Sequence, residues 1–201
     1  MNNIFENFVS NFYKKGNISI IIKSRYDVKF YHFYKYLLSQ KDALLITDSF
    51  NNYTTNKIVL NMFDETLLKV VETIKNKNVF ISAPVNEWVV SNPKEIYAPL
   101  SKIYEPMYKI YEPMYRICQE NNISLNLITQ SYKSPNNTSN IPTIHGGNSI
   151  IHAASYVVNY ENEIFDIIKN RYGINESFNI NDFKHIMAKM YREKKLERIC
   201  K

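Results

Sequence analysis

Short apolar runs alternate along the chain with stretches in which apolar residues recur at helical spacing, and this alternation predicts an α/β domain. The strand-like runs lie at 18–22, 43–47, 78–82 and 123–129. The helix-like stretches between them lie near 28–39 and 64–75. Near-continuous apolar strands are typical of burial on both faces, so we expect a mostly parallel sheet flanked by helices. A length of 201 residues suits a single domain with a full-sized core.

Both ends of the chain also show helical spacing. Apolar residues predict an amino-terminal helix before Gly16, and they are Phe5, Phe8, Val9 and Phe12. Asn181 is the predicted cap of a last helix, whose apolar face holds Phe183, Ile186, Met187 and Met190.

The predicted elements divide the chain into three parts. We expect an amino-terminal helix at 1–15, a core at 16–165 and a helical basic tail at 166–201. Within the core, the mixed run at 151–160 is expected to begin an antiparallel edge of the sheet.

The net charge of +6 is concentrated at the carboxyl end. Residues 184–201 carry seven Lys or Arg against two Glu, and the preceding residues are almost neutral. A cationic tail on a neutral body favours a polyanion or an acidic protein surface as partner. A helix that only keeps the chain in solution explains the same charges.

Composition excludes several classes of protein. No apolar run reaches 18 residues and the first twelve residues are unlike a signal peptide, so we expect a soluble, cytoplasmic protein that binds no membrane. Cys118 and Cys200 lack metal-site or redox spacing. Of the histidines, His32 is expected to pack among aromatic residues, and the spacing of all four indicates no metal site. We find no catalytic set of Ser, His and Asp or of Cys and His.

Residues 23–30 have the position and length of a phosphate-binding loop, because they follow the first strand and open a helix. Such a loop, G-x-x-x-x-G-K-[ST], needs glycines for backbone approach to phosphates, a Lys for the outer phosphates and a hydroxyl for Mg²⁺. Here Lys23 and Val28 stand at the glycine positions and Phe30 at the hydroxyl position. Only Lys29 matches the motif, so we expect no nucleotide cofactor.

A second segment carries a family resemblance. Residues 146–153, Gly-Gly-Asn-Ser-Ile-Ile-His-Ala, follow a strand that ends at Thr129-Gln130 and resemble the G-G-N-x-x-x-H-A segment of the RecA/RadA recombinase family. The run from Ala43 to Tyr53 is similar to the family's second strand, with Phe50 in place of the Glu that polarises the attacking water. The run from Val79 to Val85 is similar to the Walker B strand, with Ala83 in place of the metal-binding Asp.

This resemblance, over roughly residues 16–160, implies a RecA-like core that lacks the ATPase motifs. Phosphoryl transfer depends on Mg²⁺, the loop and a water-orienting group, so we expect no ATPase activity. The chain is similar to RadC-like paralogues of archaeal RadA, which implies an accessory role in recombination and repair, with a RadA-type recombinase or another repair protein as partner. The family's protomer-joining Phe-x-x-Ala has only Phe5-x-x-Phe8 as its analogue here, which disfavours a filament. Two alternatives stay open: a nucleotide or anion sensor at the vestigial Lys29, and an unrelated α/β protein.

Three successive heptads at 96–116 form an internal repeat with one Pro each. Proline disfavours a straight helix throughout, and we expect regular helix only from about Pro113. The repeat's Tyr, Lys and Arg suit stacking on single-stranded DNA or contact with a partner protein, and a duplication without a role explains the same residues. With cations of the next loop and the tail, the candidate DNA- or partner-binding residues are Tyr97, Lys102, Tyr104, Tyr108, Lys109, Tyr111, Tyr115, Arg116, Lys133, Lys189, Arg192, Lys194, Lys195 and Arg198.

Overall fold

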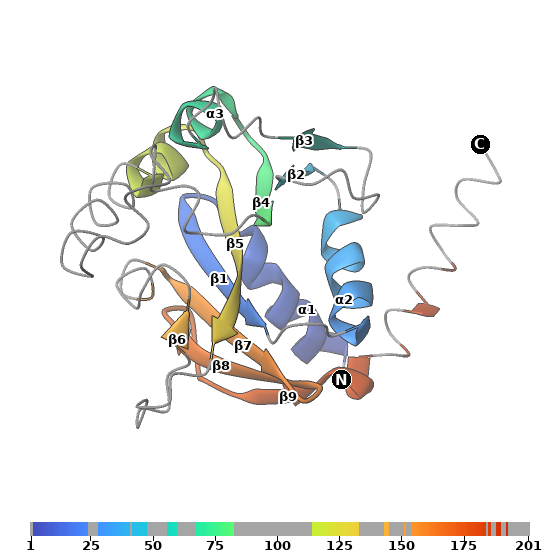
Figure 1. Ribbon diagram of the computed structural model, residues 1–201. Helices are drawn as coiled ribbons and strands as arrows, with labels where there is room; N and C mark the ends of the chain where they lie inside the picture. The colour runs from blue at the N-terminus through green and yellow to red at the C-terminus, as the bar shows by residue number, and fades with distance from the viewer. Residues whose placement is uncertain are drawn as a thin grey trace.

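A nine-stranded sheet runs through the described part of the chain, with helices on both faces (Figure 1). The computed structural model describes residues 2–23, 28–40, 42–47, 56–59, 67–82, 114–132, 143–144 and 154–183, with 151, 185, 188, 189 and 192. The strands are β1 (Asn17–Lys23), β2 (Ala43–Thr47), β3 (Lys57–Val59), β4 (Asn78–Ser82), β5 (Ser124–Tyr132), β6 (Thr143–Ile144), β7 (Tyr156–Glu161), β8 (Ile164–Asn170) and β9 (Ser177–Asn179). The helices are α1 (Asn2–Ser10), the short 3₁₀ helix η1 (Asn11–Tyr13), α2 (Val28–Leu38), α3 (Leu67–Thr73) and a helix at 114–120.

The sheet has the order β3-β2-β4-β5-β1-β7-β8-β9, and β6 pairs with β5. The six strands β3, β2, β4, β5, β1 and β7 are each parallel to their neighbours in this order. Strands β8 and β9 add an antiparallel edge, and β6 is also antiparallel to its neighbour. The predicted α/β class with a mostly parallel sheet is therefore confirmed.

Aliphatic side chains fill one face of the sheet, which we call the aliphatic face. It is covered by α3 and the helix at 114–120. Its buried residues are Ile18, Ile20, Ile22, Leu44, Ile46, Val71, Ile74, Val79, Ile81, Met114, Ile117, Cys118, Ile123, Leu125, Leu127, Ile151, Ala154 and Val157.

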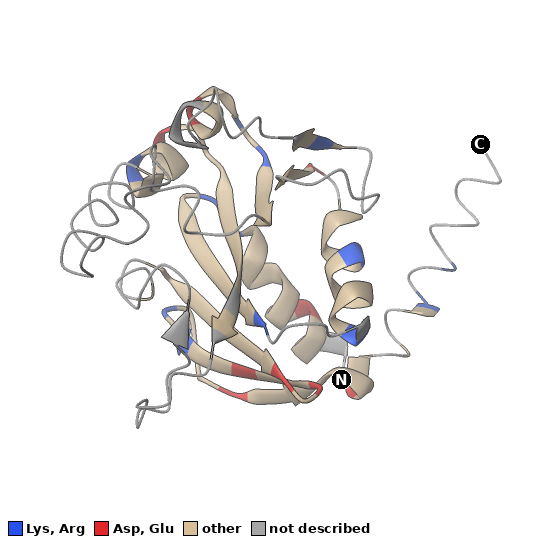
Figure 2. Cartoon of the chain, viewed as in Figure 1, with Lys and Arg blue, Asp and Glu red and all other residues tan. Residues whose placement is uncertain are grey.

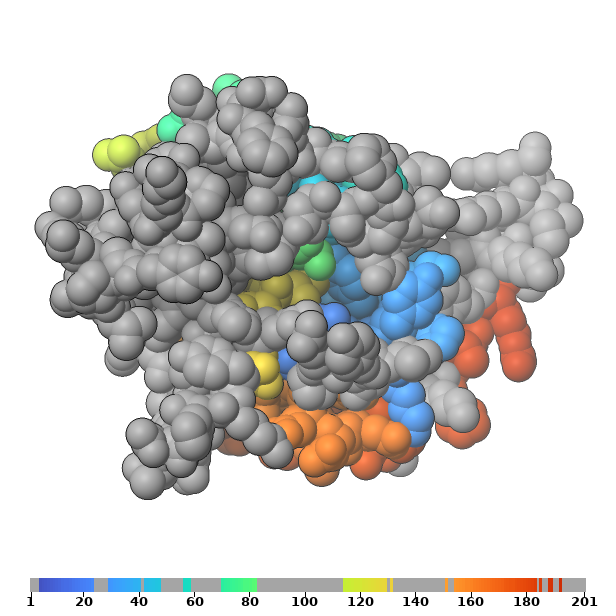
Figure 3. Space-filling view, viewed as in Figure 1, coloured from blue at the N-terminus to red at the C-terminus, as the bar shows by residue number. Residues whose placement is uncertain are grey.

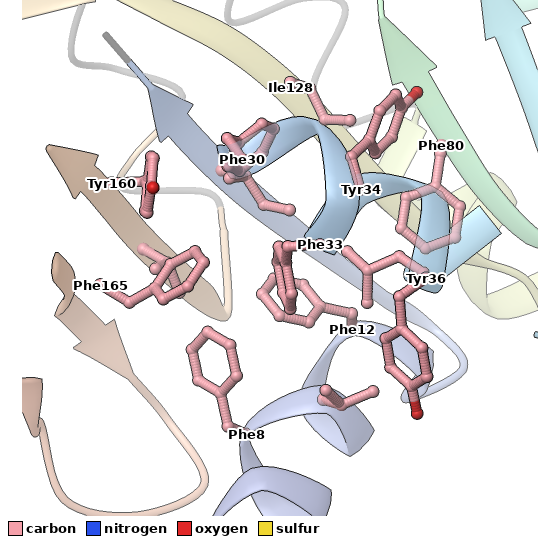
Figure 4. Packing of buried hydrophobic residues seen from close by; sticks show 14 of the residues in the cluster. Phe8, Phe12, Phe30, Phe33, Tyr34, Tyr36, Phe80, Ile128, Tyr160 and Phe165 are labelled. Atoms are coloured by element: carbon pink, nitrogen blue, oxygen red, sulfur yellow. The ribbon is translucent and has the colours of Figure 1, made fainter. Parts of the chain in front are cut away.

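Phenylalanine and tyrosine dominate the opposite face, which we call the aromatic face (Figure 4). It is covered by α1 and α2. Its buried aromatic residues are Phe5, Phe8, Phe12, Phe30, Phe33, Tyr34, Tyr36, Phe80, Tyr156, Tyr160, Phe165 and Phe183. Phe5 of α1 lies 4.7 Å, between ring centroids, from Phe183 near the other end of the chain, so this face joins the two ends.

The amino-terminal helix confirms its prediction, because Phe5, Phe8, Val9 and Phe12 are all buried on the aromatic face. The Phe5-x-x-Phe8 pair is therefore used inside the chain: Phe5 is 1% exposed and Phe8 is 2% exposed. Side chains buried in this way are not presented to a neighbouring protomer.

Three predictions about the carboxyl end were wrong. Strand β7 is parallel to β1, so the antiparallel edge begins at β8 and not within 151–160. Residues 166–170 and 177–179 are strands, because alternating residues of β8 turn inward, and helix begins only at residue 180. The cap is Asn179, whose Oδ1 accepts a hydrogen bond from the Asn181 backbone N–H at 2.9 Å. The Asn181 side chain is engaged elsewhere.

Candidate functional site: the carboxyl ends of β1 and β5

Strands β1 and β5 are neighbours that lead to opposite faces of the sheet. The chain leaves β1 for α2 on the aromatic face. It leaves β5 for residues 151 and 154, which are buried on the aliphatic face, before it returns in β7. Where neighbouring parallel strands diverge in this way, ligands bind at their carboxyl ends. The loop-like residues 23–30 begin at that point, so the topology supports the position expected for a nucleotide site.

Phe30 occupies the position of the motif's hydroxyl and lies in the core. It is 1% exposed and its ring contacts Tyr160 at 5.2 Å, Phe33 at 6.0 Å and Tyr34 at 6.2 Å between centroids. Figure 4 shows Phe30 on the first turn of α2 with its ring turned toward the aromatic face. Packing therefore explains the aromatic residue at this position, and its side chain offers no oxygen to Mg²⁺.

Lys29 forms an ion pair with Glu163 from the turn between β7 and β8. The other carboxylate oxygen of Glu163 accepts a hydrogen bond from Asn181 Nδ2 at 2.8 Å. The hydrogen bonds from Lys29 and then from Asn181 lower the pKa of Glu163. The one cation that matches the motif is thus engaged by a carboxylate of the same chain.

Lys23, at the end of β1, also contacts α2. Its Nζ lies 5.3 Å from the centroid of the Phe30 ring, a distance at which a cation is attracted to a ring face. The last residues of β2 and β4 lie side by side, because Thr47 Oγ1 donates a hydrogen bond to the Ser82 carbonyl at 3.2 Å. Each strand ends at or near the residue predicted for it.

Several motif positions fall outside the described residues. They are 24–27, 48–50, Ala83, 146–150 and 152–153. The Gly-Gly-Asn segment, which is the most specific part of the family resemblance, therefore stays a prediction, and so does the metal-carboxylate position.

Only four of the candidate DNA- or partner-binding residues are described. Arg116, Lys189 and Arg192 are exposed, whereas Tyr115 is half-buried and packs against the aliphatic face. Arg116 Nε lies 3.9 Å from Glu120 Oε1. The candidates outside the described residues are Tyr97, Lys102, Tyr104, Tyr108, Lys109, Tyr111, Lys133, Lys194, Lys195 and Arg198. Residues 114–120 are helical, as predicted for the stretch that follows Pro113, and the start of the helix lies outside the described residues.

His32 is exposed on α2, which contradicts the prediction that it is packed among aromatic residues. Its ring lies 5.7 Å from that of the neighbouring Tyr31, between centroids. Among the described residues, no group of three or more His, Cys, Asp or Glu could hold a metal ion. Within the same residues, no helix has the length and apolarity needed to cross a membrane.

The sequence analysis missed Glu163 as the partner of Lys29 and Asn181 as a second partner of Glu163. Lys29 and Glu163 are 134 positions apart, and no local pattern connects them. One signal was available: Asn162 and Glu163 separate two apolar-rich runs, which is the spacing of a two-residue hairpin that would bring one carboxylate to a strand end.

The fold is similar to that of solved RecA-like ATPases. A structure titled RadB recombinase superposes with a TM-score of 0.56 at 10% identity, over 83% of this chain and 88% of that chain. The chain has a RecA-like fold. An ATPase domain matches with a TM-score of 0.55 at 10% identity, over 82% of this chain and 81% of that domain.

A third RecA-like match is a DnaB-like replicative helicase, solved to show its interactions with primase. It has a TM-score of 0.56 at 9% identity, and the match covers 82% of this chain and 55% of the helicase. No protein-family model and no curated protein sequence matches the chain. At these identities the likeness establishes the fold and leaves activity to be tested.

Proposed function

We propose that this chain is a non-hydrolysing accessory factor of homologous recombination and DNA repair, which acts by binding a RadA-type recombinase or another repair protein. Its RecA-like fold and its similarity to RadB recombinase support the proposal. So does the family resemblance in the sequence. In this role the molecule works through its surfaces and performs no phosphoryl transfer.

Phe30 carries the proposal. A RecA-like ATPase holds Mg²⁺ partly through the hydroxyl at this position, and Mg²⁺ supplies much of the charge stabilisation in phosphoryl transfer. Here a phenyl ring fills the position and is buried against Phe33 and Tyr160. Phe30 has no hydroxyl in any rotamer, and its ring is held in the core.

The ion pair of Lys29 supports the same view and disfavours the alternative, a nucleotide or anion sensor. An incoming phosphate must compete with Glu163 for the Lys29 ammonium. In the absence of glycines at the two motif positions, backbone N–H groups add little to that competition. We therefore expect weak or no nucleotide binding by the native chain.

Hydrolysis and partner binding are tested separately. The purified chain is assayed with Mg²⁺ and ATP beside an active recombinase, and we expect no turnover above the protein-free reaction. Immobilised chain is then presented with a purified RadA-type recombinase, and we expect retention. Magnesium-dependent turnover by the chain, or passage of the recombinase without retention, would contradict the proposal.

A thermal-shift titration with ATP separates the accessory role from the sensor. A ligand that binds the native state raises stability with the logarithm of its excess over Kd. No shift at millimolar ATP leaves the accessory role, whereas a saturating shift that Lys29→Gln abolishes would favour the sensor.

DNA contact is tested by the salt dependence of binding. The exposed cations Arg116, Lys189 and Arg192 are described, and the basic tail continues beyond them. Fluorescence anisotropy with single-stranded, duplex and branched DNA gives the slope of log affinity against log salt. If the tail makes the contact, removing residues 184–201 flattens that slope, and an unchanged slope moves the contact elsewhere.

A further inference from the structure

The outward side of α2 carries cations and aromatic rings without a carboxylate. The inward side chains of the helix are buried in the aromatic face, and they are Phe30, Phe33, Tyr34, Leu37 and Leu38. The outward side chains are exposed or half-buried, and we call them the α2 outer face: Lys29, Tyr31, His32 and Lys35. The helix contains no Asp or Glu, and Figure 2 shows blue and no red along it. Its cations are therefore not offset by an acid of the same helix.

Helical spacing places the members of the α2 outer face next to one another. Lys29, His32 and Lys35 follow at intervals of three, and residues three apart are neighbours on a helix surface. Lys29 and Lys35 are about 9 Å apart along the helix axis, at about 1.5 Å per residue. Lys35 Nζ lies 5.1 Å from the centroid of the Tyr31 ring, and the Tyr31 and His32 rings are 5.7 Å apart between centroids. Cations and rings therefore share one side of the helix.

Strand β3 extends this surface with a third lysine. Lys57 pairs with Leu45 of β2, and Leu45 is buried on the aromatic face. Paired residues of neighbouring strands point to the same side of a sheet, so Lys57 lies on the side that α2 covers. The next residue, Ile58, packs against the aliphatic face, as the alternation of a strand requires. Because α2 contacts β2, the neighbour of β3, Lys57 lies on the β3 flank of the helix.

Carboxylates of two neighbouring elements lie near the ends of α2. Glu163 pairs with Lys29 at the first turn, where the two side chains are 37% and 52% exposed. Burial and then the charge of Glu6 raise the pKa of Tyr36, so Glu6 of α1 lies near the last turns of α2. An exposed ion pair is weak and screened by salt, so a phosphate can compete with Glu163 for Lys29. Glu163 therefore lowers the affinity of this surface for a polyanion, and its removal should raise that affinity.

We propose that the α2 outer face, with Lys57 beside it, is a docking surface for single-stranded nucleic acid. Its lysines suit backbone phosphates and its rings suit stacking on exposed bases, which is how proteins hold single strands without sequence preference. An acidic protein surface would need only the lysines. In the space-filling view, the light-blue atoms of α2 reach the molecular surface (Figure 3).

This surface is separate from the tyrosine repeat and from the basic residues 184–201. It goes beyond the accessory role and requires no recombinase. A failed recombinase capture assay would therefore leave it standing, and its own failure would leave the accessory role standing.

Fluorescence anisotropy of a labelled oligothymidylate, titrated with the full chain over a range of sodium chloride concentrations, tests the surface. Each lysine–phosphate contact with a single strand contributes about 0.7 to the slope of log affinity against log salt. Lys35→Gln and Lys57→Gln should each lower the affinity and reduce the slope by about that amount. Lys75→Gln is the matched control, because Lys75 is exposed and follows α3 on the opposite side of the sheet. It should keep the native affinity and slope, and all three variants should keep the native urea midpoint.

Two further variants test the rings and the acid. Tyr31→Leu should lower the affinity for oligothymidylate about fivefold or more, the loss expected for one stacked base. It should keep the salt slope, because no charge is removed. An abasic strand of the same length keeps the phosphates, so the native chain and Tyr31→Leu should bind it equally. Glu163→Gln should raise the affinity for both strands, because Lys29 loses its competing partner.

Four outcomes would overturn the surface. The native chain could bind no oligothymidylate, or Lys35→Gln and Lys57→Gln could behave like Lys75→Gln. Polyglutamate could compete as well as unlabelled oligothymidylate, which would assign the surface to an acidic protein. If Tyr31→Leu does not fold, equal binding of the abasic and the base-bearing strand by the native chain overturns it.

Discussion

The two faces of the sheet are built from different side chains and do different work. Among the described residues, none of the eighteen buried on the aliphatic face is aromatic, whereas twelve of the twenty-two buried on the aromatic face are Phe or Tyr. The aliphatic face joins central strands to the helices between them. The aromatic face also buries Phe5 of α1, Phe183 near the other end of the chain, and Phe30 in the first turn of α2. The aromatic residue at the motif's hydroxyl position is thus part of one face of the core.

The largest expected effect on stability comes from replacing Phe30 by a residue with a hydroxyl. Phe30→Ser returns a hydroxyl to the motif position and removes a ring that contacts Phe33, Tyr34 and Tyr160. Replacing a buried Phe by a small residue costs about 3–5 kcal/mol, because the cavity persists. Urea unfolding measures the loss, and thermal shift with Mg²⁺ and ATP measures any gain. We expect a large loss of stability and no nucleotide binding; the reverse outcome would show that Phe30 blocks an otherwise intact site.

His32→Ala is the matched control on the same helix. His32 is exposed, so its removal should change the free energy of unfolding by less than about 0.5 kcal/mol. A comparable loss in both variants would mean that α2 responds to any substitution.

Truncating a buried side chain on the aliphatic face should cause a somewhat smaller loss of stability. Leu127 of β5 is fully buried between the neighbouring strands and the helix at 114–120. Leu127→Ala should lower the free energy of unfolding by about 2–5 kcal/mol, measured in urea. The variant should leave the Lys29 and Glu163 contacts intact, because these lie on the other side of the sheet. A change in amide hydrogen exchange at Ile180, whose N–H donates to the Glu163 carbonyl, would break the separation between the two faces.

High pH should destabilise the molecule mainly through the aromatic face. Burial raises the pKa of Tyr156, and burial followed by the charge of Tyr36 raises the pKa of Tyr13. Below pH ~10 both folded and unfolded tyrosines are protonated, and above it the unfolded chain loses protons first. Stability therefore falls as the pH rises above about 10. Tyr156→Phe should move the alkaline unfolding midpoint upward, followed by circular dichroism.

Cys118 is the matching group on the aliphatic face, where burial raises the pKa of its thiol to about 12. An unfolded thiol ionises near pH ~8.5, so Cys118 also lowers the free energy of unfolding as the pH rises above that value. Cys118→Ala should reduce the fall in this free energy between pH ~8.5 and pH ~10. The further fall above pH ~10, which comes from the tyrosines, should stay in place. If Cys118→Ala removed the whole alkaline transition, the aromatic face would not be its source.

The central sheet could be predicted from the sequence because its strands are buried on both faces. The runs at 18–22 and 43–47 are almost uninterrupted apolar residues, and β1 and β2 match them closely. The edge was mistaken because β9 has three residues, two of them exposed, which leaves little apolar pattern to detect. Lys29 could be found from its place in a motif. Glu163 could not, since its role depends on a hairpin geometry and on partners in α2 and at residue 181.

The smallest expected effect concerns two neighbouring residues of the tyrosine repeat. Tyr115 packs on the aliphatic face, whereas Arg116 is exposed and pairs with Glu120 at 3.9 Å, with side chains 73% and 66% exposed. Such a pair contributes about 0.3–0.5 kcal/mol, so Arg116→Gln should barely change urea unfolding. If the helix at 114–120 meets DNA, the same variant should reduce the salt slope of binding by about one. Glu120→Gln breaks the same pair but keeps the cation, so it should keep the slope. An unchanged slope in Arg116→Gln would leave this helix with a purely structural role, as its packing on the aliphatic face already suggests for Tyr115.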